Sequence, residues 1–329
     1  MTFGTTDDGG ATRLGLGTGP LGNLFTAVPE EQALATVRAA WELGIRHVDT
    51  APHYGLGLAE ERLGRALREI GAARDELTVS TKVGRVLEPN SGYRHGQLDD
   101  AFAVPATLRR RWDPSDAGVR RSLEDSLERL GLDHVDTLYL HDPEAYDVDE
   151  GIARALPALV RLREEGLVRR VGVGSGDLDV LVRCVREADL DEVICANRYT
   201  LLEQPAAEHL LPLCLGRGVD VVAAGVYNSG ALASATMPDD VVYEYAPAPD
   251  SVVARVRRLY DICRAHGVAV PAAAVQFAAG HPAVTTVLVG ARHPDEVTAA
   301  VAHASAEIPD ALWTDLLEQG LIAAVPQGR

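Results

Sequence analysis

Residues 30–50 read EEQALATVRAAWELGIRHVDT, and this stretch holds the pattern that decides the fold. Apolar residues recur at helical spacing up to Leu43, Gly44 follows, and a short β-type run then ends near Asp49. Glycine commonly ends helices because it adopts the left-handed backbone conformation at no steric cost. We therefore expect a helix over residues 30–43, a stop at Gly44 and a strand over residues 46–50.

The same alternation of helix and strand repeats along the whole chain. Short β-type runs lie at residues 13–16, 46–50, 77–83, 135–141, 169–174, 192–199, 219–226 and 285–289. Amphipathic stretches between them lie at residues 30–43, 59–70, 119–130, 152–165, 177–187, 206–217 and 252–265. Such alternation indicates parallel strands joined by crossover helices. Eight units predict an α/β fold, a (β/α)8 TIM barrel, with a doubly wound open sheet as the alternative.

The charge balance excludes some classes of partner. The chain has 329 residues and a formal net charge of −17, with 31 Lys and Arg against 48 Asp and Glu. Nucleic acids and anionic membranes both attract clustered basic residues, so we expect neither as a partner. No apolar run reaches the ~18 residues of a membrane-spanning helix, and unclustered cysteines are typical of reduced thiols in a core. We expect a cytoplasmic protein without a metal site.

The expected domain organisation is simple, because no long linker rich in Pro, Gly and Ser divides the chain. Residues 1–11 are expected to be a disordered lead-in, and residues 12–329 a single barrel domain. Two long loops stand out: residues 84–114 follow the third expected strand and residues 228–250 the seventh. Both leave the carboxyl ends of strands, where barrel enzymes build their active sites. Arg109–Arg111 in the first loop is expected to be a solvated edge, with attraction of an anion as the alternative. The roles of Tyr243 and Tyr245 in the second loop stay open.

Residues 15–22, GLGTGPLG, formally match the G-x-G-x-x-G fingerprint of dinucleotide-binding folds. That fingerprint requires a helix directly after the last glycine, because the N-terminus of the helix holds the pyrophosphate. Here Pro20 and residues 23–29 intervene before the expected helix start near Glu30. We therefore expect a glycine-rich loop that closes on a ligand at the barrel mouth, not a Rossmann turn.

Three successive strand ends carry titratable side chains. HVDTAPHYG ends the second strand at Asp49 and places Tyr54 in the turn; LTVSTKVG ends in Lys82 and VDTLYLHD in His141. Period-two alternation turns the strand residues to one inner face, where Asp49 and Lys82 can pair. A nearby ammonium lowers the pKa of a phenol from about 10 toward neutrality. Lys82 is the only lysine in the chain, and arginine does not replace a compact ammonium in that role.

In this order and on these strands, Asp49, Tyr54, Lys82 and His141 resemble the catalytic tetrad of the aldo-keto reductase superfamily. The resemblance implies that Tyr54 is the general acid/base, tuned by Lys82 and Asp49. It also implies that His141 orients the substrate oxygen while hydride passes between nicotinamide and substrate carbon. WDPSDAGVRRSLEDSLERLGLD at residues 112–133, with HDP at 141–143, is similar to bacterial D-threo-aldose 1-dehydrogenases, also called L-fucose or galactose dehydrogenases. Pyridoxal 4-dehydrogenase is a near relative of that branch.

The resemblance also implies contacts to cofactor and substrate. Ser175 and Asn197 match residues that hold the nicotinamide carboxamide, although the Asn that usually follows the Ser is absent. Tyr227, or Val226, is the candidate for packing on the nicotinamide ring. The other cofactor candidates are Thr18, Gly19, Asn228, Ser229, Gly230 and Leu232 for the pyrophosphate, and Gly290, Arg292 and Glu296 for the adenosine. For the substrate, the candidates are His53, beside Tyr54, and Trp112, which offers a flat face to a ring.

The position of Glu296 bears on the choice of cofactor. In the family, this position usually carries Arg or Gln, whereas a carboxylate repels a 2′-phosphate and accepts hydrogen bonds from ribose hydroxyls. Glu296 therefore favours NAD, while Arg292 keeps NADP open because a guanidinium can bind a phosphate.

The expected function is oxidation of an aldose of the L-fucose, D-arabinose or L-galactose type at C1 to its lactone, with NAD or NADP. One alternative is an NAD(P)H-dependent aldehyde or ketone reductase, or a pyridoxal dehydrogenase-like enzyme, of the same fold. Another is a non-catalytic, cofactor-sensing subunit. The expected partner is a small sugar or carbonyl compound, and the sequence does not indicate an oligomeric state.

Overall fold

The computed structural model describes residues 13–327, so the expected disordered lead-in over residues 1–11 lies outside the described residues. The central strands form a closed (β/α)8 barrel, in the order β1 (Leu14–Gly17), β12 (Val284–Gly290), β9 (Asp220–Ala224), β8 (Glu192–Ala196), β7 (Val168–Ser175), β6 (Val135–His141), β3 (Thr78–Val83) and β2 (His47–Asp49). The predicted fold class is confirmed, and the open-sheet alternative is wrong. The described residues divide into two compact units: Gly15–Val193 with Gly290–Thr298 form the first, and residues 13–14, 194–289 and 299–327 form the second. That residues 12–329 make one domain stays a prediction.

The elements follow the predicted alternation of strand and helix. The strands are β1 Leu14–Gly17, β2 His47–Asp49, β3 Thr78–Val83, β4 Arg85–Pro89, β5 Leu108–Trp112, β6 Val135–His141, β7 Val168–Ser175, β8 Glu192–Ala196, β9 Asp220–Ala224, β10 Val242–Tyr243, β11 Ala246–Pro247 and β12 Val284–Gly290. The α-helices are α1 Glu30–Glu42, α2 Leu58–Ile70, α3 Asp116–Leu130, α4 Val148–Glu150, α5 Leu156–Glu164, α6 Leu178–Glu187, α7 Leu210–Arg217, α8 Asp250–Ala265, α9 Val270–Ala279, α10 Pro294–Ala304 and α11 Asp310–Glu318.

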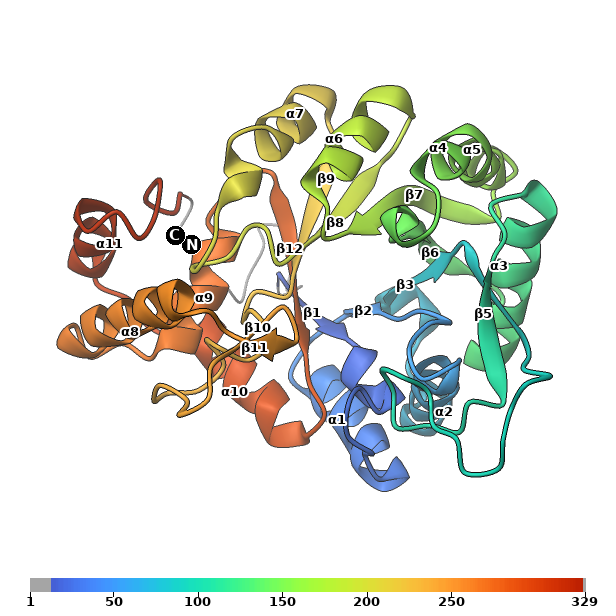
Figure 1. Ribbon diagram of the computed structural model, residues 1–329, viewed down its shortest axis with the longest axis horizontal. Coiled ribbons are helices and arrows are strands. Elements are labelled where there is room, and N and C mark those ends of the chain that lie inside the picture. The colour runs from blue at the N-terminus through green and yellow to red at the C-terminus, as the bar shows by residue number, and fades with distance from the viewer. Residues whose placement is uncertain (1–12, 328–329) are drawn as a thin grey trace. The chain divides into compact units, whose positions relative to one another are not determined.

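In the first unit, β1, β2, β3, β6 and β7 pair in parallel (Figure 1). Asp49 lies beside Ser80 in the register of β2 and β3, and Lys82 lies beside Tyr139 in that of β3 and β6. Residues beside each other in register share a face, so these side chains line one side. Thr81 points the other way and donates a hydrogen bond to Glu60 of α2 at 2.6 Å. The predicted inner and outer faces are confirmed.

Glycines end the helices as the sequence predicts. Gly44, Gly131, Gly166 and Gly218 all have a positive φ, between 66° and 84°. Ser115 caps α3 by accepting a hydrogen bond from the amide of Gly118 at 3.1 Å. Gly64 has a different role: a Cβ there would lie 2.1 Å from the carbonyl oxygen of Leu130. Only glycine therefore allows α2 and α3 to approach this closely.

The segment over residues 84–114 is not a plain loop. Its ends, β4 and β5, form an antiparallel hairpin in which Arg85 lies opposite Trp112. Arg109 and Arg111 bind Glu88 across the two strands, at 2.5 and 2.8 Å. Arg110 lies on the other face, mostly buried, and binds Asp99 at 2.6 Å. The expected solvated edge is therefore wrong for Arg110, because strand alternation sends it inward.

In the second unit, β9 and β12 pair in parallel, α7 packs on β9, and α8 packs against α9 and α11 (Figure 1). The segment over residues 228–250 contains a two-stranded pair, β10 and β11, which the sequence did not indicate. Within residues 13–327, no single helix is long and apolar enough to cross a membrane. Helices α8 and α9 reach that length and apolar character only together, and the chain bends by 100° between them. The four cysteines are buried and free.

Glu60 supports a stability prediction, because this carboxylate on α2 is fully buried. It accepts hydrogen bonds from Thr81 at 2.6 Å and from Arg129 at 2.7 Å. Removing one partner of a buried ion pair leaves the other charge uncompensated, which costs about 3–5 kcal/mol. We expect Glu60→Ala to lower the free energy of unfolding by about 3 kcal/mol, measured by urea denaturation. The control is Glu61→Ala on the exposed side of the same helix; equal effects of the two changes would contradict the prediction.

Candidate active site

The centre of the site is a buried ion pair between Asp49, at the end of β2, and Lys82, near the end of β3. Lys82 Nζ lies 2.6 Å from Asp49 Oδ2, and both side chains are at most 4% exposed. Lys82 also donates to the carbonyl of Thr50 at 2.8 Å, and Ser80 donates to Asp49 Oδ1 at 2.7 Å. Each carboxylate oxygen is therefore bonded, and two of the three ammonium protons are used.

Tyr54 lies in the turn after β2, with its ring centroid 4.7 Å from Lys82 Nζ. The glycine-rich loop over residues 17–22 holds this turn. A Cβ on Gly22 would lie 2.6 Å from the carbonyl carbon of Tyr54, and a Cβ on Gly55 would lie 2.3 Å from the Gly22 oxygen. Gly19–Gly22 is a single 3-10 turn and α1 begins only at Glu30, so rejection of a Rossmann turn is confirmed.

The electrostatics of Tyr54 differ from the expectation. Burial raises the pKa of Tyr54 to about 12, although the charge of Lys82 and the hydrogen bond between the two side chains both act to lower it. The expected net lowering toward neutrality is wrong for the free protein, because desolvation of the phenolate outweighs the ammonium. Burial alone would lower the pKa of Lys82, but Asp49 and Tyr54 raise it above its ordinary value. The free site therefore holds a neutral phenol beside a charged ammonium.

His141, at the end of β6, meets Tyr54 edge to face, with ring centroids 5.7 Å apart. Burial lowers the pKa of His141 well below its ordinary value, and the charges of Arg85 and Lys82 add to the effect. His53 lies 5.5 Å from the His141 ring. Burial and the charges of Arg85 and Arg110 lower the pKa of His53 to about 2. Both imidazoles are therefore neutral at physiological pH.

Aromatic side chains pack on His53 and beside Arg85. Phe102 packs edge to face on His53, at 5.3 Å between centroids. Trp112 stacks on Tyr146 with centroids 5.0 Å apart and planes 6° from parallel. Trp112 and His53 are predicted from the sequence, whereas Phe102 and Tyr146 are not. Both lie outside regular strands, in segments without a periodic pattern, so only the folded chain brings them to the site.

The cofactor candidates of the first unit have the following surroundings. Thr18 is fully buried, and its hydroxyl donates to the carbonyl of Asp49 at 3.0 Å, so it supports the end of β2. Ser175 Oγ donates to Glu144 at 2.5 Å and accepts from the amide of Asp177. Open space surrounds the position of a Cβ on Gly19, whereas a Cβ on Gly290 would lie 3.2 Å from Pro20.

Glu296, in the first turn of α10, accepts a hydrogen bond from the amide of Arg292 at 2.8 Å. The carboxylate is therefore fixed at the start of the helix, beside the backbone of Arg292. The carbonyl of Arg292 in turn accepts a hydrogen bond from Gln32 at 2.7 Å. Arg292 and Glu296 are thus brought together, and their roles as adenosine contacts stay predictions.

The second unit holds the remaining cofactor candidates. Asn197 has a φ of 63°, and its Oδ1 occupies the space beside Gly225, where a Cβ would lie 2.1 Å away. Asn228 is 2% exposed, and neither its Oδ1 nor its Nδ2 has a hydrogen-bond partner. The amides of Gly230 and Leu232 donate to the carbonyl of Tyr227, and the roles of these residues at the pyrophosphate stay predictions.

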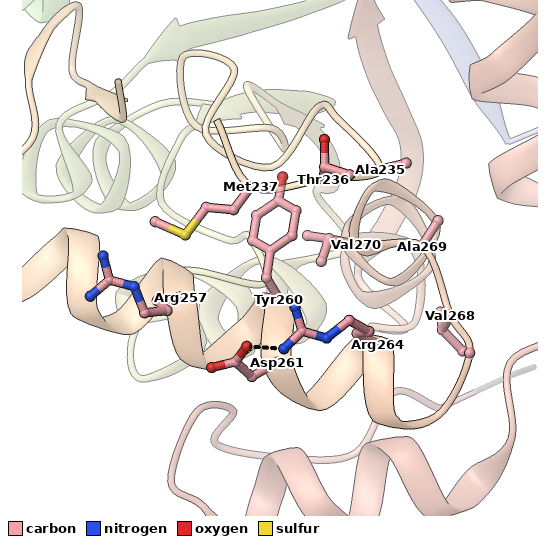
Figure 2. Close-up of a pocket in the computed structure, with 11 residues that line it drawn as sticks. Ala235, Thr236, Met237, Arg257, Tyr260, Asp261, Arg264, Val268, Ala269 and Val270 are labelled. Atoms are coloured by element: carbon pink, nitrogen blue, oxygen red, sulfur yellow. Dashed lines mark hydrogen bonds and ion pairs between the residues drawn. The ribbon is translucent and has the colours of Figure 1, made fainter. Parts of the chain in front are cut away.

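Three other tyrosines of the second unit have the following surroundings. Tyr243 donates to Glu203 at 2.7 Å, and Tyr245 is 63% exposed. Tyr260 of α8 donates to the carbonyls of Ala231 and Ser234, at 3.2 and 3.0 Å. Figure 2 shows Tyr260 at a cavity of about 510 Å³, where Arg264 and Asp261 form an ion pair. No tetrad residue lines that cavity.

A parallel barrel with a buried Asp–Lys pair, a tyrosine and a neutral histidine at its strand ends has the architecture of a barrel oxidoreductase. Residues 13–318 match the model of the aldo/keto reductase family, and the chain belongs to that family. It is therefore an oxidoreductase, of a family that uses NAD(P)(H) and acts on small carbonyl or sugar substrates.

Known proteins similar to this chain include two dehydrogenases. The chain is 50% identical over 311 residues to the D-threo-aldose 1-dehydrogenase of a Pseudomonas species, covering 94% of each. It is 39% identical to the pyridoxal 4-dehydrogenase of Microbacterium luteolum, over 95% of each. A solved aldo-keto reductase, AKR11C1 from Bacillus halodurans in its holo form, superposes with a TM-score of 0.75 at 26% identity, over 99% of this chain and 97% of that one.

Substitution of Lys82 tests the role of the ion pair at the centre of the site. In Lys82→Arg the charge remains, but a planar guanidinium does not reproduce the hydrogen bonds of the ammonium to Asp49 and Thr50 and its position beside Tyr54. We expect kcat to fall at least about 100-fold, the scale of general acid–base catalysis, with NADH affinity measured by fluorescence within about threefold.

The control for folding is the thermal unfolding curve, and Lys82→Met, of similar length, is the second variant. Near-normal turnover in a folded Lys82→Arg protein would contradict the assigned role of the ammonium.

Proposed function

We propose that this enzyme oxidises an aldose at C1 to the lactone, with Tyr54 as the acid/base. The observation that carries the proposal is the Lys82 ammonium, held by Asp49 and Thr50 and placed 4.7 Å from the centroid of the Tyr54 ring. The 50% identity to a D-threo-aldose 1-dehydrogenase supports the choice of substrate class.

The site's own residues account for the proton in this reaction. In the oxidising direction, the phenolate of Tyr54 accepts the proton of the anomeric hydroxyl as the C1–O bond becomes a carbonyl, and Lys82 stabilises that phenolate. His141, neutral because of burial, hydrogen-bonds the same oxygen. The nicotinamide, when bound, supplies the acceptor for the hydride from the anomeric carbon. In the reverse direction, neutral Tyr54 returns the proton to the carbonyl oxygen.

The residues assigned to the dinucleotide fit a polar ligand. The buried amide of Asn228 has both a donor and an acceptor without a partner, and unpaired buried groups cost free energy unless a ligand satisfies them. We infer that NAD is preferred over NADP, because Asp295 and Glu296 in the first turn of α10 repel a 2′-phosphate. Arg292 is the group that would favour NADP.

A second candidate substrate is pyridoxal. The identity of 39% to a pyridoxal 4-dehydrogenase favours it, as does the stacked pair of Trp112 and Tyr146, which suits a flat ring. A reductase acting on simple aldehydes uses the same tetrad in the other direction. A non-catalytic subunit would not need the buried Asp49–Lys82 pair, whose desolvation costs several kcal/mol per ion.

A substrate panel tests the proposal. L-Fucose, D-arabinose, L-galactose and pyridoxal are offered with NAD and with NADP, and simple aldehydes with the reduced cofactors, followed at 340 nm. We expect the highest kcat/KM for an aldose with NAD, and loss of at least about 1,000-fold in Tyr54→Phe.

Three results of the panel would count against the proposal. A higher kcat/KM for pyridoxal than for any aldose would indicate a pyridoxal dehydrogenase instead. A higher kcat/KM for a simple aldehyde would indicate an aldehyde reductase. A preference for NADP of tenfold or more would overturn the inference about NAD.

The pKa of Tyr54 predicts the pH dependence of oxidation. Because burial raises the pKa of Tyr54 to about 12 in the free protein, the phenolate is the minor form, and its fraction grows about tenfold per pH unit below that value. We expect log(kcat/KM) for aldose oxidation to rise with a slope near one between about pH 6 and 9. Activity measured after return to pH 7 controls for unfolding. A flat profile would contradict the prediction.

A further inference from the structure

Arg85 and Asp142 form an ion pair next to the tetrad, and the sequence pattern indicates no role for either. Arg85 starts β4, three residues after Lys82, and Asp142 directly follows His141. Arg85 Nη2 lies 2.7 Å from Asp142 Oδ2, and the same oxygen lies 3.5 Å from His141 Nε2. The carboxylate of Asp142 therefore lies next to His141, the histidine that is expected to contact the reacting oxygen.

The backbone of Asp142 is unusual. It has φ 40° and ψ 62°, in the left-handed region that residues other than glycine rarely adopt. Backbone strain of this kind collects at functional sites, where the surrounding structure holds a side chain in one direction. Here the turn brings the carboxylate back against Arg85, and the amide of Asp142 is held by the carbonyl of Gly174 at 2.9 Å.

The carboxylate of Asp142 has unoccupied hydrogen-bond acceptor positions and is only partly buried. Its contacts to Arg85 and His141 both fall on Oδ2, and the side chain is 35% exposed, against 8% for Arg85. A carboxylate has about four acceptor positions on its two oxygens. The pair therefore retains capacity to accept hydrogen bonds from a ligand.

The neighbouring residues carry buried polar atoms without partners. In the described part of the chain, no hydrogen bond is made by Arg85 Nε, Trp112 Nε1, His53 Nδ1 or His141 Nδ1. These four residues belong to one cluster. Arg85 lies over Tyr146 at 5.5 Å, and Tyr146 stacks on Trp112. Asp142 links Arg85 to His141, whose ring lies 5.5 Å from that of His53. So many unsatisfied buried groups in one place indicate a ligand with several hydrogen-bonding groups.

We propose that Asp142 and Arg85 recognise the hydroxyl group on the carbon next to the reacting carbon, so that this pair selects hydroxylated substrates over plain aldehydes. This inference rests on the proposed function. A sugar hydroxyl both donates and accepts, so it donates to Asp142 and accepts from Arg85. His141 binds the reacting oxygen, and Asp142, 3.5 Å from His141, binds the neighbouring one.

The test compares D-arabinose with 2-deoxy-D-ribose, which lacks the hydroxyl next to the reacting carbon. We expect wild-type kcat/KM to favour D-arabinose about 100-fold, as expected for a site built to bond a hydroxyl. In Asp142→Asn this preference is expected to fall below about fivefold, through a higher KM for D-arabinose. The kcat/KM for 2-deoxy-D-ribose is expected to change less than about threefold.

Both variants are chosen to preserve the fold. Asparagine tolerates the left-handed region, so Asp142→Asn retains the backbone conformation. Arg85→Lys keeps the charge but loses the planar guanidinium, and it is expected to weaken the preference for D-arabinose as well. The control is Asp147→Asn, an exposed helix cap on the same segment that still caps as asparagine; it is expected to leave both substrates unaffected.

The failures of the two proposals are distinguishable. Equal losses on both sugars in Asp142→Asn, with wild-type aldose activity present, would overturn this inference alone and show that Asp142 acts through His141. A wild-type enzyme that turns over both sugars equally well would also overturn it. If the wild-type enzyme turns over no aldose with either cofactor, the proposed function fails, and this inference fails with it.

Discussion

The buried ion pair of Asp49 and Lys82 is the constraint on which the site depends. Removing two charges from water costs several kcal/mol per ion, and their attraction offsets this only when the remaining hydrogen-bonding groups are also satisfied. Here Ser80 and Thr50 complete the bonding, at 2.7 and 2.8 Å. Two hydrogen bonds, to Asp49 and Thr50, fix the orientation of the Lys82 ammonium and leave its third proton for Tyr54. The position of the acid/base therefore follows from an ion pair rather than from a flexible side chain.

The backbone places Tyr54 over that ion pair by close packing. Gly22 and Gly55 touch so closely that neither tolerates a Cβ, and Thr18 ties the same loop to the carbonyl of Asp49. Gly22, one of the glycines that mimic a dinucleotide fingerprint, thus holds the tyrosine turn. A glycine pattern in a sequence indicates that two backbone segments approach closely. Only the folded structure shows which segment lies against the glycines.

The tetrad was predictable because local rules suffice for it. Glycines that end the helices mark where the next strand begins, and period-two alternation puts Asp49, Lys82 and His141 on one face. Other features depend on non-local pairing: β4 and β5 are strands only because they pair with each other. Helix α9 was missed because every one of its residues is buried, so it has no amphipathic period. The pairing of Arg85 with Asp142 depends on one left-handed residue, which no spacing rule indicates.

The fixed charges around the site, together with burial, make Tyr54 the residue that exchanges a proton with the substrate. Lys82, Arg85 and Arg110 are cations fixed by carboxylates, and together with burial they keep His53 and His141 neutral. Neither imidazole therefore exchanges a proton with the substrate near neutral pH. Tyr54 alone has a proton to give, since burial keeps its hydroxyl neutral. Of these three cations, Lys82 is the one that favours the phenolate of Tyr54. Lys82 therefore both helps to keep His141 neutral and stabilises the tyrosine once its proton has moved.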